Sequence, residues 1–178
     1  MSASHRLPLG DALLLAVCAF ALSACGSAEP PTARQHFEQL VGEWEGTHRL
    51  LDNPNEYSAL YSISLDGDVL VHSFSSTWEG GYTGYERMTI KKDGTLVATW
   101  SDSGGDDSLV TEGSWDGTTR TLEMKGDGMS WTDPEKAIQY RHVTAYADNS
   151  FTYTMHLTED SEEREVMWIE MSRKAAGS

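Results

Sequence analysis

The chain has 178 residues, which is enough for one domain with a sizeable core. Its 28 acidic residues outnumber the 13 basic residues, so the formal net charge is −15. A surface this acidic repels nucleic-acid phosphates and anionic lipid head groups, so we do not expect the protein to bind nucleic acid.

The first 24 residues have the organisation of a signal peptide. A polar start with Arg6 precedes an unbroken apolar run over residues 13–22. This run is short for a bilayer span, which takes about 20 residues. The stretch LSAC that ends at Cys25 matches the lipobox of bacterial lipoproteins, which are cleaved before the cysteine and lipidated on it. We therefore predict a signal peptide over residues 1–24 and lipidation of Cys25. The alternative is a plain secretory signal that leaves Cys25 unmodified.

The region after the leader indicates the cellular address. The other cysteine, Cys18, lies in the leader, so the mature domain is expected to have neither a disulfide nor a nucleophilic thiol. Gly26 stands where Gram-negative lipoproteins retained at the inner membrane commonly have Asp, which favours the periplasmic face of the outer membrane. Residues 25–34 are expected to form a short lipidated tether that contains prolines. Removing the leader takes away one acidic and one basic residue, so the net charge stays −15.

The first predicted element of the mature part is a short helix. Phe37, Leu40 and Val41 follow i, i+3, i+4 spacing and therefore share one helical face. Thr32 is placed to cap its start and Gly42 to end it. The helix is too short to form a helical domain, so we expect it to act as a lid or plug.

The rest of the mature chain has the pattern of short strands joined by tight turns. Residues 57–65 alternate between apolar or aromatic side chains on one face and serines on the other, apart from Leu60. Asp-Gly pairs at residues 66–67, 93–94 and 116–117 mark hairpin turns. Counting such segments to the end of the chain predicts about ten strands of ordinary length.

These strands predict an all-β fold. An open sheet of ten hairpin-linked strands would expose its edges, and closing the sheet removes them. Gly46, Gly84 and Gly113 fall inside strands, where glycines often mark bends. We therefore predict a single up-and-down antiparallel β-barrel of about 8–10 strands over residues 35–174, with a disordered tail at 175–178.

The start and the end of the predicted barrel resemble the calycin superfamily, which includes lipocalins and fatty-acid-binding proteins. The resemblance lies in Gly42-x-Trp44, at the start of the first strand after a short helix. In those barrels the tryptophan plugs the closed end, and an arginine late in the last strand stacks across it. Arg173, in MSRK, takes that place here. The resemblance implies that Gly42, Trp44 and Arg173 close the barrel floor through a cation–π contact.

A closer resemblance is to a bacterial lipocalin-like family, the domain of unknown function 1579, over residues 35–174. It rests on five short motifs in the same order, namely LVGEWEG, GYTGYERM, ATWSDS, YRHVTAY and MSRK. The chain departs from the family at Glu86, where Asp is common, and in a short loop after the first strand. The family implies a fold and no established reaction.

The predicted interior is rich in aromatic side chains. The chain has six Trp, seven Tyr and four Phe. A barrel of this size has room for one small ligand among apolar rings and a few polar anchors. Tyr85, Trp100, Asp102 and Arg141 are the candidate ligand-binding residues. The net charge favours a neutral or cationic ligand, whereas an inward Arg141 would hold a carboxylate. The alternative is that these side chains fill the core completely.

Three patterns that suggest other chemistry have simpler explanations. The string Asp-Ser-Gly-Gly at residues 102–105 resembles a serine-protease motif, but no histidine lies in a protease-like context, so we interpret it as a hairpin loop. The acidic residues 102, 106 and 107 lack the spacing of a calcium-binding EF-hand and suggest a solvated loop. The acidic stretch at residues 158–165 also suggests a solvated hairpin tip.

Haem is a possible cofactor, because haem-binding barrels occur in the wider lipocalin-like group. It would need one inward histidine, and His72, His142 and His156 lie within predicted strands. Most strand histidines are ordinary core or surface residues. We therefore predict no catalytic residue, no metal and no cofactor.

Together these patterns predict a lipid-anchored periplasmic lipocalin-like barrel that binds a small apolar or amphipathic molecule without catalysis. One alternative is an enzyme that uses the barrel cavity, with Asp102 and Arg141 as acid/base and anion clamp. Another is a structural lipoprotein of the cell envelope with a filled core. An enclosed cavity above about 300 Å³ would favour binding or catalysis.

Overall fold

The computed structural model describes residues 29–105, 108–130 and 135–175. The signal peptide and residues 25–28 of the tether, including Cys25, lie outside the described residues, so lipidation stays a prediction. Asp106 and Asp107 of the calcium hypothesis lie outside them as well. Among the described residues, no helix combines the length and apolar character needed to span a membrane.

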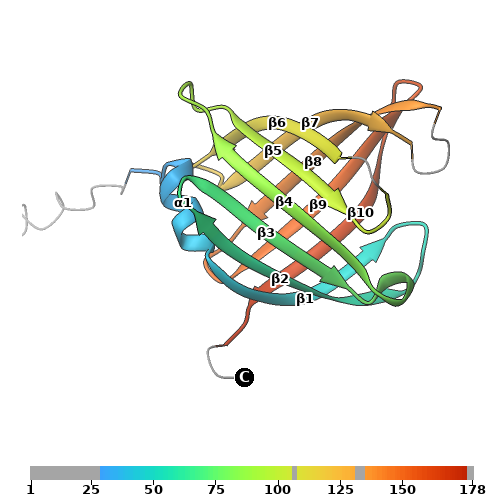
Figure 1. Ribbon diagram of the computed structural model, residues 1–178, viewed down its shortest axis with the longest axis horizontal. Coiled ribbons are helices and arrows are strands. Elements are labelled where there is room, and N and C mark those ends of the chain that lie inside the picture. The colour runs from blue at the N-terminus through green and yellow to red at the C-terminus, as the bar shows by residue number, and fades with distance from the viewer. Residues whose placement is uncertain (1–28, 106–107, 131–134, 176–178) are drawn as a thin grey trace, which may run out of the picture.

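Ten antiparallel strands close into one barrel in chain order, with the first strand paired to both the second and the last (Figure 1). This confirms the predicted fold class. The elements are α1 (Ala33–Leu40), β1 (Gly42–Leu50), β2 (Glu56–Asp66), β3 (Val69–Ser76), the 3₁₀ turn η1 (Trp78–Gly80), β4 (Tyr82–Ile90), β5 (Leu96–Asp102), β6 (Ser108–Asp116), β7 (Thr121–Met129), β8 (Ala137–Tyr146), β9 (Ser150–Glu159) and β10 (Glu162–Arg173).

Closure depends on close backbone approach at two glycines within strands. A Cβ atom on Gly46 would lie 1.8 Å from the carbonyl oxygen of Glu170 on β10. One on Gly113 would lie 1.9 Å from the carbonyl oxygen of Glu123 on β7. Both positions therefore exclude any side chain. Each strand is paired on both sides, and the core lies within residues 33–173.

The helix α1 starts as predicted but ends earlier. The Thr32 side chain accepts a hydrogen bond from the backbone N–H of Gln35, and the Gln35 side chain accepts one from the N–H of Thr32, a capping box. The last helical residue is Leu40, and the extended backbone of Val41 leads directly into β1. Val41 is 41% exposed, so its predicted place on the buried face is wrong. The i+4 rule fails there because the helix has already ended.

The helix closes one end of the barrel, on the side opposite the loops that follow β1, β3 and β9 (Figure 1). His36, rather than Val41, completes the buried face and stacks on the Trp115 ring with 3.9 Å between centroids. The Trp115 indole N–H donates to the carbonyl oxygen of Pro31 at 2.9 Å. Arg34 pairs with Asp68 in the turn between β2 and β3. The predicted plug is therefore held by stacking, hydrogen bonding and charge.

The core lies inside the barrel, since alternate side chains of each strand point inward. Buried positions along β2, for example, follow every second residue from Ala59 to Ile63. The largest fully buried side chains are those of His36, Phe37, Trp44, His48, Leu70, Met88, Leu96, Ile169 and Met171.

Candidate ligand-binding site in the barrel

The structure brings Gly42, Trp44 and Arg173 together at the floor of the barrel. The Trp44 ring is 1% exposed, and the guanidinium carbon of Arg173 lies 4.3 Å from its centroid. The indole N–H of Trp44 donates to the carbonyl oxygen of Leu40, and Arg173 donates to that of Val41, both at 2.9 Å. Gly42 has φ of +139°, and a Cβ there would lie 2.8 Å from the guanidinium. The floor thus joins the helix to both the first and the last strand.

Two predicted ligand anchors lie on the outer wall instead. Arg141 makes a bidentate ion pair with Glu163, at 2.7 and 2.9 Å, outside the barrel. Tyr85 is 40% exposed, and its hydroxyl accepts a hydrogen bond from Arg87. The expectation that both side chains point inward is therefore wrong. Side chains alternate along a strand, and the neighbouring His142 takes the inward position on β8.

The other two predicted anchors, Trp100 and Asp102, are brought together near the mouth, the end of the barrel opposite α1. The indole N–H of Trp100 donates to Oδ2 of Asp102 at 2.8 Å, and Oδ1 accepts from the backbone of Gly104. The Trp100 ring packs over Gly84, where a Cβ atom would lie 2.0 Å from the ring. Gly84 therefore leaves the space that this indole fills.

The sequence analysis missed an inward carboxylate in the middle of the barrel. Oε2 of Glu86 lies 2.8 Å from Nδ1 of His72, and the two residues are partners across β3 and β4. Their side chains are 15% and 10% exposed. The signal was present in GYERM, because Gly84 and Met88 are both inward and Glu86 stands between them. The family resemblance names Glu86 only as a position where Asp is common and predicts no role for it.

Tyr61 lies beside this pair, whereas Tyr146 packs against His36 at the floor and Tyr153 against His142. The rings of Tyr61 and His72 lie 6.1 Å apart. Burial raises the pKa of Tyr61, Tyr146 and Tyr153, and the negative charge of Glu86 raises each pKa further. We call His72, Glu86 and Tyr61 the polar centre.

Aromatic rings lie between the polar centre and the mouth. The Trp78 and Tyr82 rings lie 5.1 Å apart, and Phe74 lies 6.0 Å from Tyr82 and 6.3 Å from Trp100. The His48 ring lies 5.8 Å from Phe74. Trp78, Tyr82 and Trp100 keep part of their surface exposed. We call these five rings the mouth rings.

The inward histidines carry ring nitrogens with no protein partner. Burial lowers the pKa of His48 and of His142 to about 4, so both imidazoles are neutral at pH 7. Nε2 of His48, His72 and His142 is buried and accepts or donates no hydrogen bond within the described ranges. These nitrogens are polar groups in apolar surroundings, which is unfavourable unless a ligand or water satisfies them.

The histidine positions also bear on the haem hypothesis. His72 and His142 point inward, but His156 lies opposite Arg141 on the outer wall, so it is not a candidate. His72, with Nδ1 held by Glu86 and Nε2 free, has the arrangement of a ligating imidazole. A single imidazole does not define a metal site, and within the described part no three His, Cys, Asp or Glu side chains converge on one.

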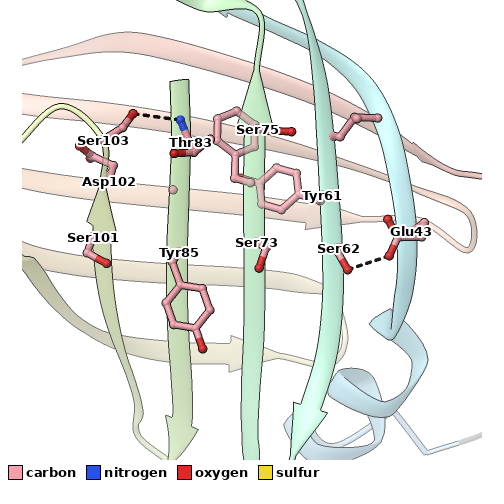
Figure 2. Close-up of a pocket in the computed structure, with 13 residues that line it drawn as sticks. Glu43, Tyr61, Ser62, Ser73, Ser75, Thr83, Tyr85, Ser101, Asp102 and Ser103 are labelled. Carbon is pink, nitrogen blue, oxygen red and sulfur yellow. Dashed lines mark hydrogen bonds between the residues drawn. The ribbon is translucent and has the colours of Figure 1, made fainter. Parts of the chain in front are cut away.

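A hollow lies on the outer wall over β1 to β5 (Figure 2). It is a shallow depression of about 680 Å³ that opens to solvent. Ser62 donates to Glu43 at 2.7 Å, and the Ser103 hydroxyl accepts from the Thr83 backbone at 3.1 Å. Tyr85 lies among these hydroxyls (Figure 2). The depression is thus lined by serine and threonine hydroxyls together with apolar surface such as that of Leu60, and it does not enclose a ligand.

Comparisons with known proteins support the family resemblance. No curated protein matches the chain. A solved structure described as "EF1p2_mFAP2b bound to DFHBI" is 12% identical, with a TM-score of 0.43, over 77% of this chain and 95% of that one. A likeness this weak carries no information on function. The family described as "Protein of unknown function (DUF1579)" matches residues 29–173. Because this match spans most of the sequence, the chain belongs to the DUF1579 family.

Proposed function

We propose that the protein binds a small, partly apolar molecule inside its barrel. The observation that carries this proposal is the partial exposure of inward side chains. Tyr82, Glu86, Trp100 and Tyr153 all point inward and all keep accessible surface. A completely packed interior would bury them, because protein cores are as dense as organic crystals. Their exposure supports an open space between the mouth and the polar centre.

The lining of this space suits a small organic ligand. Binding sites for such molecules combine apolar and aromatic walls with a few polar groups that fix orientation. The mouth rings form the walls, and Glu86 with the free Nε2 of His72 forms the polar end. The outer depression is a weaker candidate, because a molecule lying on it would keep one side in water.

We also propose that Cys25 is lipidated and anchors the barrel at the outer membrane. The lipobox-like sequence supports this, and the structure adds an expected orientation. Pro31, six residues after Cys25, is tied to Trp115 beside the floor. Six extended residues reach at most about 20 Å. The floor would then face the membrane and the mouth the periplasm, so that a ligand enters from the aqueous side.

Two tyrosines on β4 allow the proposed site to be tested with a matched pair of variants. Tyr82 is inward at the mouth, and Tyr85 is outward in the depression. The soluble form, residues 27–178, is titrated with 1-aminoanthracene, a neutral fluorescent probe. We expect Tyr82→Ala to weaken binding at least about tenfold, since an aromatic contact of 1.4 kcal/mol or more is lost, and Tyr85→Ala to leave it unchanged. The reverse result would move the site to the outer wall, and no binding by the wild type would support a filled core.

A further inference from the structure

The inward carboxylate of Glu86 has one oxygen that makes no hydrogen bond within the described part of the protein. Glu86 has one protein partner, Nδ1 of His72, which contacts Oε2. Its other oxygen, Oε1, makes no hydrogen bond or ion pair within the described part of the protein, and the Glu86 side chain keeps 15% of its surface exposed. A carboxylate withdrawn from bulk water is unfavourable unless it is paired and hydrogen-bonded. Oε1 is therefore open to a hydrogen-bond donor supplied by a ligand.

The charge of the interior indicates what kind of donor fits. No lysine or arginine lies among the described inward residues in the middle of the barrel. His48 and His142 stay neutral because burial lowers the pKa of both. Asp102 adds a second carboxylate near the mouth. With two carboxylates and no lysine or arginine among these described residues, the interior repels anions and attracts cations.

The aromatic lining favours the same class of ligand. Tyr61 belongs to the polar centre, and the centroid of the Phe74 ring lies 4.8 Å from that of Tyr61 and 6.3 Å from that of Trp100. Ring faces attract ammonium groups through their negative quadrupole, and the attraction grows when water is excluded. The acceptor Nε2 of a neutral imidazole adds a further site for an N–H donor.

From these contacts we infer that the barrel binds an organic amine, whose ammonium group pairs with Oε1 of Glu86 while its apolar body lies among the mouth rings. This inference rests on the proposed function and specifies the ligand class of the same site. Glu86 lies four residues along β4 from Tyr82 at the mouth. At about 3.3 Å per residue the two are about 13 Å apart along the strand. The body of the ligand is therefore about as long as a phenylbutyl group.

The test compares three molecules that share one body. 4-Phenylbutylamine, 4-phenylbutan-1-ol and 4-phenylbutyrate are titrated into residues 27–178 by calorimetry at pH 7. We expect the amine to bind at least about tenfold more tightly than the alcohol, and the acid to bind most weakly. Glu86→Gln keeps the shape of the side chain and removes its charge. It should weaken amine binding at least about tenfold and change alcohol binding less than about threefold.

The control is Glu45→Gln, which makes the same change of net charge on the exposed face of β1. It should leave all three affinities unchanged. If none of the three molecules binds, the proposed function fails and the inference with it. If the alcohol or the acid binds as well as the amine, binding in the barrel stands and the amine inference is overturned.

Equal loss of amine preference in both variants would also overturn the inference, because the overall charge would then be the cause. An unchanged preference in Glu86→Gln would do so too. Should Glu86→Gln not fold, Glu86→Asp takes its place. Aspartate keeps the negative charge on a side chain that is one methylene shorter. We expect this variant to bind the amine more weakly than the wild type does, but still to bind the amine more tightly than the alcohol and the acid. Loss of that order would count against Glu86 as the anchor.

Discussion

Acid should destabilise this barrel strongly, because three of its histidines are buried in the neutral form. Burial lowers the pKa of His36, His48 and His142 from 6.5 to about 4. In the unfolded chain the same imidazoles take up protons below pH 6.5. The unfolded state therefore binds more protons than the folded state between pH 6.5 and 4. Stability is fully present above pH 6.5 and falls as the pH drops through this window.

The size of the effect follows from the shifts. One pKa unit corresponds to about 1.4 kcal/mol. At pH 5 each unfolded imidazole is protonated and each folded one is mostly neutral, so each histidine lowers the free energy of unfolding by about 2 kcal/mol. The three together lower it by about 6 kcal/mol, against a total of about 5–15 kcal/mol for a typical domain. We expect the barrel to be close to its unfolding midpoint near pH 5.

Urea unfolding at pH 7, 6 and 5, followed by tryptophan fluorescence, measures this loss. His36→Phe keeps a ring to stack on Trp115 and removes one titrating group. It should reduce the loss between pH 7 and 5 by about 2 kcal/mol. His156→Gln removes a histidine from the outer wall and serves as the control. A barrel that is as stable at pH 5 as at pH 7, or a His36→Phe variant with an unchanged pH dependence, would refute the reasoning.

Three further predictions concern the floor, the wall and the anchor. Trp44→Ala should cost about 3–5 kcal/mol of unfolding free energy, and Arg173→Ala less. The double variant should lose less unfolding free energy than the sum of the two single losses, since the two side chains touch. Additive losses in urea unfolding would contradict the contact. Gly84→Ala should destabilise the barrel by about 1–3 kcal/mol in the same assay, because the new methyl group overlaps the Trp100 ring, and an unchanged midpoint would argue against that packing. Cys25→Ser should move the protein out of the membrane fraction and abolish fatty-acid labelling, and equal labelling of both forms would exclude Cys25 as the modified residue.

Local sequence was sufficient for the fold class because the signals that specify it are local. The alternation over residues 57–65 and the Asp-Gly turns act within a few positions of the chain. Each hairpin could therefore be predicted without knowledge of the neighbouring strands. The start of the helix was equally local, since Thr32 and Gln35 cap it across three residues. The end of the helix was not specified locally. The pairing of β1 with β2 begins at Gly42, so Val41 already has a non-helical backbone conformation.

The polar site depended on tertiary structure, because polar residues stand on both faces of the strands that build it. In QYRHV either Arg141 or His142 can point inward, and a shift of one residue exchanges them. Pairing with β7 and β9 places His142 on the inward face of β8. Arg141 therefore lies on the outer face, where it forms an ion pair with Glu163. The contact of His72 with Glu86 likewise arises from the register of β3 against β4, fourteen positions apart in the chain. Hydrophobic alternation specifies which strands form, whereas the closed sheet determines which of their polar side chains meet inside it.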